Sequence, residues 1–300
     1  MSAALHSCGP STTNRHRRPS RAEVDSRREE LRAIVEENQP VTVRGAMYLC
    51  YTRGLCGKDD KGYRRVQYDV KVMRRAGQVP YAHIVDHTRW MRKPRTHDSL
   101  EAALEETAET YRKALWTRAN SYAETWCEKN ALAGTILPVT AAYDVPLMVT
   151  VGHSSDTFAE SAGQVIEAED RPCFIYYLGD WDPPGVCASV KLEEKLRAFA
   201  PTADIHFERV GVTEQQIREW QLPTQPTPKK SAQHYRRFWP GGDSCQLDAV
   251  PPHQLRGLLR ERIERHLPVA ELDALGRIEE AERETFRRFL DSWRTNGGAS

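Results

Sequence analysis

Two aspartates, Asp180 and Asp182, stand one residue apart directly after an apolar run, and their type and spacing suit metal chemistry. The run before them, Cys173 to Leu178, is apolar and aromatic, which is typical of a buried strand in a parallel sheet. Two carboxylates at this spacing repel each other unless a cation lies between them. A hard ion such as Mg²⁺, with Mn²⁺ as the alternative, takes carboxylate oxygens and keeps waters for a phosphate partner.

The residues that flank this pair predict where it lies in the fold. Gly179 ends the apolar run, Pro183 to Gly185 is expected to form a turn, and the helix Val186 to Phe199 follows. Open α/β sheets place their sites at the carboxyl ends of the strands, so we expect the two acids at such an edge. The alternative is structural, with Asp180 as the cap of the next helix and Asp182 in the turn.

A third acid, Glu128, follows an earlier strand of the same kind. The run from Ala123 to Asn130 is expected to form a short strand that ends in Glu128-Lys129, and a helix from Ala131 to Ala142 comes next. Val145 to Val151 is the following expected strand, and its exit loop contains Ser154 and Ser155. Backbone amides and hydroxyls in such a loop can hold a phosphate, a role compatible with capping a helix.

The order strand, acid, helix, strand, acid-x-acid resembles a Toprim domain. It is similar to the A subunit of type IIB topoisomerases (topoisomerase VI), to meiotic double-strand-break transesterases and to the Toprim nucleases of Wadjet-type plasmid-defence systems. The resemblance runs from about Tyr122 to about Leu267, and its matching pieces are Glu128-Lys129, Val149 to Ser155, Gly179 to Gly185, and Gln246 to Pro252. It implies a Rossmann-like α/β fold with a parallel sheet. It also implies that Glu128, Asp180 and Asp182 are catalytic and hold the metal, and that Leu247 to Ala249 is a return strand. Asp248 is expected to be structural rather than a metal ligand, and a position close to the site stays open for it.

The residues before this region predict a second, DNA-binding domain. A helix from Ala22 to about Asn38, a helix capped by Thr42, a basic helix from Tyr63 to Ala76 and an extended segment from Val79 to Asp86 form the pattern of an α+β winged helix. A winged helix precedes the Toprim domain in the resembling family. The basic helix would enter the major groove of double-stranded DNA through Arg64, Arg65, Lys71, Arg74 and Arg75. The alternative is a solvated face of an ordinary helical domain.

The same region contains a candidate nucleophile, Tyr48. The resembling transesterases cut DNA with the second tyrosine of an R-x-x-Y-Y motif, and Arg44 and Tyr48 keep its first and last positions while Met47 replaces the first tyrosine. In that family the metal comes from the other protomer, which implies a homodimer. Two interpretations stay open: Tyr48 attacks the phosphodiester, or Tyr48 packs in its own domain and the metal activates water instead.

Composition limits the partners and the compartment. The 43 basic and 42 acidic residues give a net charge of +1, so DNA affinity must come from local patches. Seven cysteines without a C-x-x-C pair indicate reduced thiols in a cytoplasm. No apolar run approaches the ~20 residues of a membrane span. No P-loop motif is present, so strand passage would require a separate ATPase partner.

The expected organisation is a disordered tail (1–20), a winged-helix domain (21–98), a linker helix (99–120, with Leu100 to about Arg118 helical) and a Toprim domain with two C-terminal helices (121–300). The sequence thus predicts a Mg²⁺-dependent DNA-cleaving enzyme, either a nuclease or a tyrosine transesterase. A DNA-binding regulator with an inert Toprim-like domain is the alternative. An enzyme acting on RNA is disfavoured, because the A-form major groove is too narrow for the basic helix.

Overall fold

A computed structural model of the chain describes residues 19–84, 95–150, 154–267 and 269–295, and the side chains of 269–271 are not described. The expected tail at 1–20 therefore lies almost wholly outside the described residues. Within them, no helix combines the length and the apolar character needed to cross a lipid bilayer.

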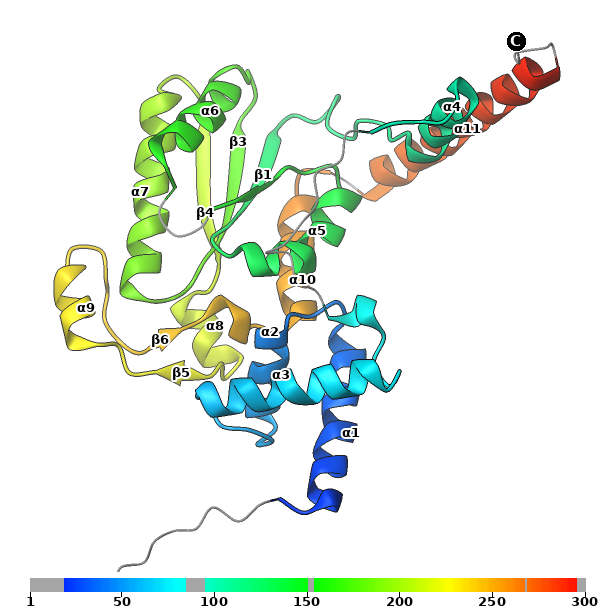
Figure 1. The fold of residues 1–300 in the computed structure, drawn as a ribbon. Helices are drawn as coiled ribbons and strands as arrows, with labels where there is room; N and C mark the ends of the chain where they lie inside the picture. Colours follow the sequence, from blue (N-terminus) through cyan, green and yellow to red (C-terminus); the bar gives the residue numbers. More distant parts are fainter. Residues whose placement is uncertain (1–18, 85–94, 151–153, 268, 296–300) are drawn as a thin grey trace, which may run out of the picture.

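A four-stranded parallel sheet forms the centre of the molecule, which confirms the expected α/β class (Figure 1). Its strands are β1 (Tyr122–Cys127), β2 (Leu147–Val149), β3 (Cys173–Leu178) and β4 (Ile205–Gly211), in the order β2-β1-β3-β4. The strand predicted from the apolar run 173–178 has these bounds in the structure. β1 and β2 are shorter than expected: β1 ends before Glu128, and β2 covers only part of 145–151.

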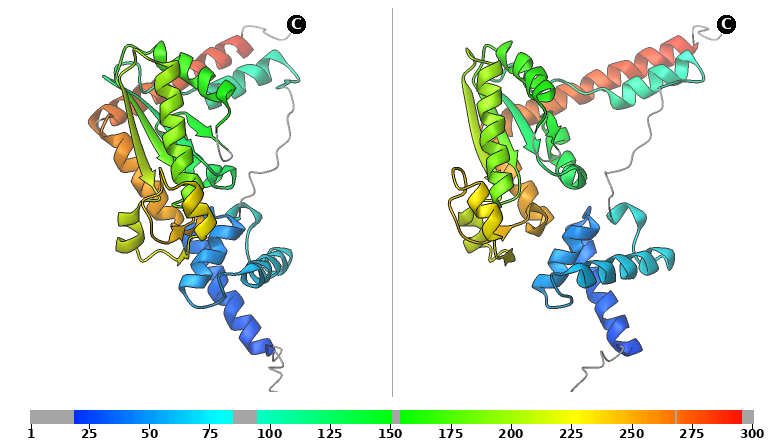
Figure 2. Two further views of the ribbon diagram at one scale, coloured as in Figure 1. Left: turned by 90° about the vertical axis from the view of Figure 1, so that its left-hand side faces the viewer. Right: turned by 60° about the vertical axis from the view of Figure 1, so that its left-hand side comes forward.

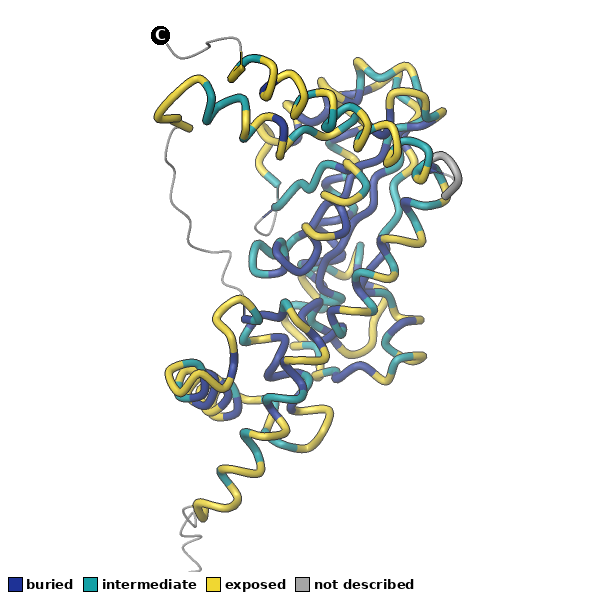
Figure 3. Tube along the Cα trace, turned by 90° about the vertical axis from the view of Figure 1, so that its right-hand side faces the viewer, coloured by how far each residue is buried: buried dark blue, intermediate teal, exposed yellow. Residues whose placement is uncertain are grey.

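Helices cover both faces of this sheet, which explains why β3 is apolar throughout instead of alternating. Ile175 and Tyr177 point to the side of α6 (Asp156–Glu167) and α7 (Pro183–Phe199), where they join one core cluster. Tyr176 and Leu178 join the other cluster, which includes residues of α5 (Ala133–Ala142) and α10 (Pro252–Glu264). Figure 3 shows the buried strands between these layers.

The first three helices of the chain pack together: α1 (Arg21–Asn38), α2 (Val43–Thr52) and α3 (Asp60–Arg75). Thr42 caps α2 as expected, accepting a hydrogen bond from the Gly45 amide at 2.9 Å. The buried carboxylate of Asp69 on α3 forms ion pairs with Arg27 at 2.8 Å and Arg28 at 2.9 Å, and these pairs join α3 to α1.

The expectation of an extended segment at 79–86 is wrong for residues 81–83. Tyr81–His83 form a short 3-10 helix, η1, and Ile84 makes an isolated parallel bridge to Val41. Arg74 explains the bend, because its guanidinium donates to the carbonyls of Tyr81 at 2.6 Å and Ile84 at 3.1 Å. Residues 85–94 lie outside the described ranges, so the end of the expected segment, at 85–86, stays a prediction.

The helix expected from Leu100 to about Arg118 is also shorter, because α4 spans only Leu100–Thr110. The chain turns at Tyr111, whose hydroxyl donates to Glu282 at 2.7 Å and whose carbonyl accepts from Arg283 at 2.9 Å. Both partners lie on the last helix, α11 (Val269–Thr295). α4 and α11 pack side by side as an arm that projects from the sheet (Figures 1 and 2).

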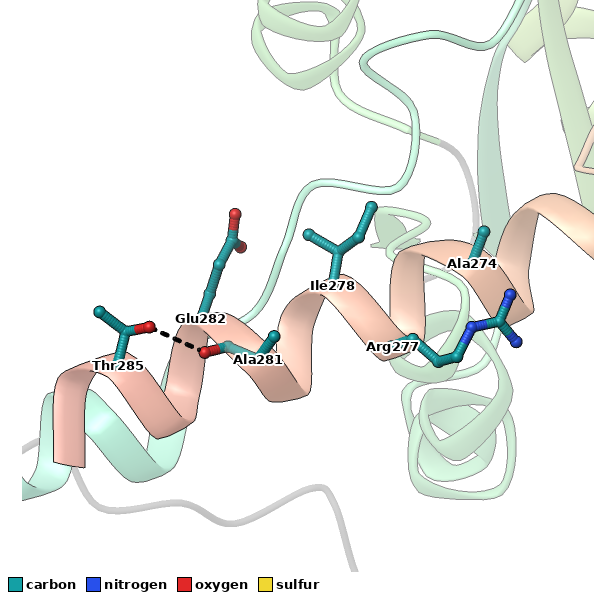
Figure 4. Close-up of a pocket in the computed structure, with 6 residues that line it drawn as sticks. All are labelled: Ala274, Arg277, Ile278, Ala281, Glu282 and Thr285. Carbon is teal, nitrogen blue, oxygen red and sulfur yellow. Dashed lines mark hydrogen bonds between the residues drawn. The ribbon is translucent and has the colours of Figure 1, made fainter. Parts of the chain in front are cut away.

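A shallow groove of 480 Å³ lies on this arm (Figure 4). It is lined by Ala274, Arg277, Ile278, Ala281, Glu282 and Thr285. All six residues belong to α11, so the groove contains none of the acids singled out by the sequence.

The chain between β4 and α10 contains short elements only. They are α8 (Glu214–Glu219), the two-stranded sheet of β5 (Thr224–Gln225) with β6 (Ser244–Cys245), α9 (Lys229–His234) and the 3-10 helix η3 (Leu247–Ala249). The expected return strand at 247–249 is therefore wrong. The Leu247 amide donates to the side chain of Asp180 at 2.7 Å, so this segment folds around a carboxylate instead of pairing with the sheet.

The Asp69 ion pairs give a stability test. Replacement of Asp69 by alanine leaves Arg27 and Arg28 without their shared partner. We expect the free energy of unfolding to fall by about 3 kcal/mol. This value is at the low end for a buried ion pair, because both arginines keep some solvent contact. Urea denaturation measures the loss. Asp25→Ala, which removes an exposed pair with Arg21, is the control and should change stability by less than about 0.5 kcal/mol. Equal losses in the two variants would contradict the assignment.

Candidate metal and phosphate site

The parallel pairing of β1 with β3 brings Glu128 next to Asp180. Cys127 lies opposite Leu178 at the end of the two strands, and the Glu128 amide donates to the Leu178 carbonyl at 2.8 Å. The Glu128 side chain then turns back, and its Oε2 accepts the Asp180 amide at 3.1 Å. Two acids that are 52 residues apart in the chain thus meet at the carboxyl edge of the sheet.

Asp182 begins α7 and stands at the same edge. Its Oδ1 accepts the Gly185 amide at 2.8 Å, which makes Asp182 the N-cap and Pro183-Pro184-Gly185 the first turn of the helix. The separate Pro-Pro-Gly turn expected from the sequence is therefore wrong. The structural alternative assigned the helix cap to Asp180 and the turn to Asp182. In the structure it is Asp182 that caps the helix.

Glycines allow these groups to approach closely. A Cβ at position 179 would lie 2.6 Å from Glu128 Oε2, and one at position 185 would lie 2.5 Å from the Asp180 carbonyl. Real Cβ atoms do not come so close to neighbouring atoms. Gly179 and Gly185 therefore keep open the space in which Glu128 and the loop from 179 to 182 pack together.

Lys129 connects Asp180 to a fourth acid, Asp248. Its ammonium lies 2.8 Å from Asp180 Oδ1 and 2.5 Å from Asp248 Oδ2, and it also donates to Gln246 at 3.0 Å. Burial acts to lower the pKa of Lys129, but the two carboxylates outweigh it, so this pKa lies above its ordinary value. The ammonium therefore stays charged, and it binds β1 to the segment around η3.

Arg209 of β4 holds the loop that contains the aspartates. Its guanidinium donates to the carbonyls of Gly179 at 3.1 Å, Val212 at 3.0 Å and Gly185 at 3.3 Å, and also to the Asp180 carbonyl. Burial lowers the pKa of Arg209, with nearby acids opposing that effect. The positive charge lies behind the loop and fixes the backbone from which the acids project.

The carboxyls of Glu128 and Asp182 have pKa values above their ordinary ranges. Burial is the main cause for both, and the negative charge of Asp180 adds to it. Their charged forms are therefore destabilised in the fold, and a bound cation would relieve that destabilisation. This is the electrostatic condition of a site that binds positive charge.

The donor set suits an ion that keeps its own waters. Glu128, Asp180 and Asp182 each use one carboxylate oxygen in the hydrogen bonds above, and within the described ranges no hydrogen bond involves the other oxygen. Among the described residues, no three His, Cys, Asp or Glu side chains are placed so that they could hold a metal ion as they stand. Mg²⁺ fits such an arrangement, because it is bound by one or two carboxylates and completes its shell with water and phosphate.

Tyr48 and Arg44, the candidate nucleophile and its partner, lie on α2. This helix packs against η3, so Tyr48 lies near Asp248 and Lys129 of its own chain. The Tyr48 side chain is buried, with 4% of the residue exposed, and Lys58 stands 5.6 Å above its ring. Burial raises the pKa of Tyr48, and the charges of Arg44 and Lys129 oppose this rise. A buried phenol with a raised pKa is a poor nucleophile as it stands.

The basic residues of α3 divide into two groups. Arg74 is engaged with the carbonyls that follow the helix and with the Tyr81 ring, 4.3 Å away. The others are exposed, opposite the buried face of the helix: Arg64, Arg65, Lys71 and Arg75. Four of the five predicted DNA contacts are thus free to meet a phosphate backbone.

Ser154 and Ser155 follow the described end of β2 at the same sheet edge. Ser155 is the N-cap of α6 and accepts the Phe158 amide at 3.2 Å, so its hydroxyl already has a structural role. The Ser154 carbonyl accepts from Lys195 at 2.7 Å, while its buried hydroxyl has no partner among the described residues. The rest of the predicted phosphate loop, residues 151–153, lies outside the described ranges.

The sequence did not single out Lys129, Arg209 or Gln246 as parts of this site. Lys129 and Gln246 belonged to motifs quoted for the resemblance, but nothing in their local pattern showed that they meet. Comparison with models of protein families and with curated proteins finds no match to this chain.

The raised pKa of Glu128 gives a pH-dependent stability test. Since folding favours its protonated form, the stability it contributes is present below about pH 4.3 and is lost as pH rises through the raised value. Glu128→Gln keeps the acceptor for the Asp180 amide and cannot ionise. We expect this variant to melt at a higher temperature than the wild type at about pH 7.5, and at the same temperature near pH 4.

Differential scanning calorimetry in EDTA across this pH range makes the measurement. Glu160→Gln, on the exposed face of α6, is the matched control and should follow the wild type at every pH. A Glu128→Gln variant that melts below the wild type at neutral pH would contradict the proposed destabilisation.

Proposed function

We propose that this protein is a Mg²⁺-dependent DNA nuclease of the Toprim type. The observation that carries the proposal is the meeting of Glu128 with the Asp180-Asp182 pair at the carboxyl edge of a parallel sheet. Three acids from two strand ends, two of them with raised pKa values, are costly to hold together unless they bind a cation. Phosphodiester cleavage is the chemistry that such an ion serves in DNA enzymes.

The ion, when bound, would act as a Lewis acid on a phosphate oxygen and lower the pKa of a coordinated water. Glu128, Asp180 and Asp182 would hold it through the oxygens that the fold leaves without hydrogen bonds. Lys129 limits the negative charge that a DNA phosphate meets on approach, and Arg209 fixes the loop backbone. The residues of this chain would thus hold the ion, balance the charge around it and fix the loop from which the aspartates project.

Water is the nucleophile in this proposal, and Tyr48 is a packing residue. The buried ring and the raised pKa of Tyr48 support this choice over a tyrosine transesterase. Hydrolysis does not need a tyrosine from a second protomer, so a homodimer is not required for the chemistry. Strand passage by an associated ATPase is not part of this function either.

The helices before the sheet are proposed to hold the DNA duplex, in the manner of a winged helix. Arg64, Lys71 and Arg75 lie along one side of α3 with the exposed ring of Tyr68 among them. Phosphate contacts by such a stripe give affinity without sequence preference. A DNA-binding regulator with an inert acid cluster would share this surface, so a cleavage assay must separate the two functions.

The cleavage test uses supercoiled plasmid with Mg²⁺ or Mn²⁺. We expect nicking or linearisation that EDTA abolishes, and a loss of more than about 100-fold in Asp182→Asn and Glu128→Gln, beyond the effect of an outer-shell change. Asparagine still caps α7, so Asp182→Asn should keep the fold. Asp243→Asn, an exposed acid near β6, is the matched control and should cut normally.

The same assay assigns the nucleophile. Tyr48→Phe should keep wild-type cutting, and the DNA ends should carry no protein when the products are run with and without protease. If the wild type leaves protein attached to the DNA ends and Tyr48→Phe does not, the enzyme is a tyrosine transesterase and not a hydrolase. Metal-independent DNA binding with no cutting at all would favour the regulator.

DNA affinity is expected to depend on the exposed stripe of α3. The triple variant Arg64→Ala, Lys71→Ala, Arg75→Ala removes three positive charges, so the slope of log affinity against log salt should fall in magnitude by about 2 to 3. Fluorescence anisotropy with duplex DNA measures this slope. A triple variant on the arm (Arg277→Ala, Arg287→Ala, Arg288→Ala) removes the same charge and should leave the slope unchanged.

A further inference from the structure

Lys129 occupies a site that has the character of a cation site. An ammonium has three donor hydrogens, and Lys129 directs them to three oxygens: Asp248 Oδ2, Asp180 Oδ1 and Gln246 Oε1. Carboxylate and amide oxygens are also the ligands that hard divalent ions take. The ammonium therefore stands where the local chemistry would otherwise accept a metal ion.

Two successive residues, Glu128 and Lys129, contact Asp180 from different sides. The backbone at Lys129 is extended, so the side chains of Glu128 and Lys129 point to opposite sides. Glu128 lies against the Asp180 amide, and Lys129 reaches across to Asp248. Asp180 thus has an acidic side next to Glu128 and a neutralised side next to Lys129.

Asp248 shows that the neutralised side has unused ligand capacity. The residue is 3% exposed, and its Oδ1 is buried without a hydrogen-bond partner among the described residues. An orphaned carboxylate oxygen in a buried position is costly, and it would be a ready ligand if the ammonium were removed.

We propose that Lys129 is a built-in substitute for a second metal ion, which restricts this site to one divalent ion on the Glu128 side of Asp180. This inference rests on the proposed function for the first ion only. Lys129 supplies one positive charge through the chain itself, and Asp248 is its counter-ion. Removal of the ammonium opens a second divalent site made of Asp180, Gln246 and Asp248.

The test counts bound ions in the full-length protein. Mn²⁺ is titrated into wild type and Lys129→Met, and free Mn²⁺ is followed by electron paramagnetic resonance. Methionine keeps most of the length of the side chain without its charge. We expect one ion per wild-type chain and two per Lys129→Met chain. Lys191→Met, a change of the same kind at a partly exposed position on α7, is the matched control and should bind one ion.

A double variant checks that the extra ion lies where the proposal puts it. Lys129→Met with Asp248→Asn removes the new ligand and should return to one ion. Because it also removes both charges of the buried pair, it keeps the measurement possible if Lys129→Met alone folds poorly. Rescue of a poorly folded Lys129→Met by Mn²⁺, seen as a rise in its melting temperature above the control's, would support the proposal in the same way.

The outcomes separate this inference from the proposed function. Two ions in the wild type, or a folded Lys129→Met that binds the wild-type number, would overturn the inference and leave the nuclease proposal intact. No ion in the wild type and one in Lys129→Met would remove the metal from the proposed function while supporting Lys129 as the resident cation.

Discussion

The parallel pairing of β1 with β3 is the constraint on which the site depends. Because Cys127 lies opposite Leu178, the next residues of both strands emerge side by side, and Glu128 meets the Asp180 amide. A shift of one residue would turn the side chains of a strand to the other face of the sheet. Ile175 and Tyr177 pack in one core cluster, and Tyr176 and Leu178 pack in the other. A shift would exchange these side chains between the clusters, so core packing holds the acids in position.

Charge balance around the acids follows from the same packing. Burial, with the negative charge of Asp180 adding to it, raises the pKa values of Glu128 and Asp182, so their charged forms are costly in the fold. Lys129 and Arg209 compensate in different ways: the first pairs with the side chains of Asp180 and Asp248, and the second binds loop carbonyls. Lys129 and Arg209 therefore offset part of the cost that the buried acids impose on the fold.

Local patterns predicted most elements and failed where a distant contact takes over. The apolar run at 173–178 and the capped helix after Thr42 were predicted, because burial and capping are encoded within a few residues. The strand at 247–249 was wrong because the Leu247 amide binds Asp180. The helix after Leu100 was too long because Glu282 and Arg283 of α11 hold Tyr111.

The sequence by itself determined that this is an α/β chain with acids placed after two buried strands, since periodicity and chain order are local properties. Only the tertiary structure decided which groups surround those acids. Lys129 meets Asp248 from 119 residues away, and Tyr48 is buried near the same pair rather than exposed to a substrate. Such contacts depend on how layers pack, and packing joins residues whose neighbours in the chain give no indication of the meeting.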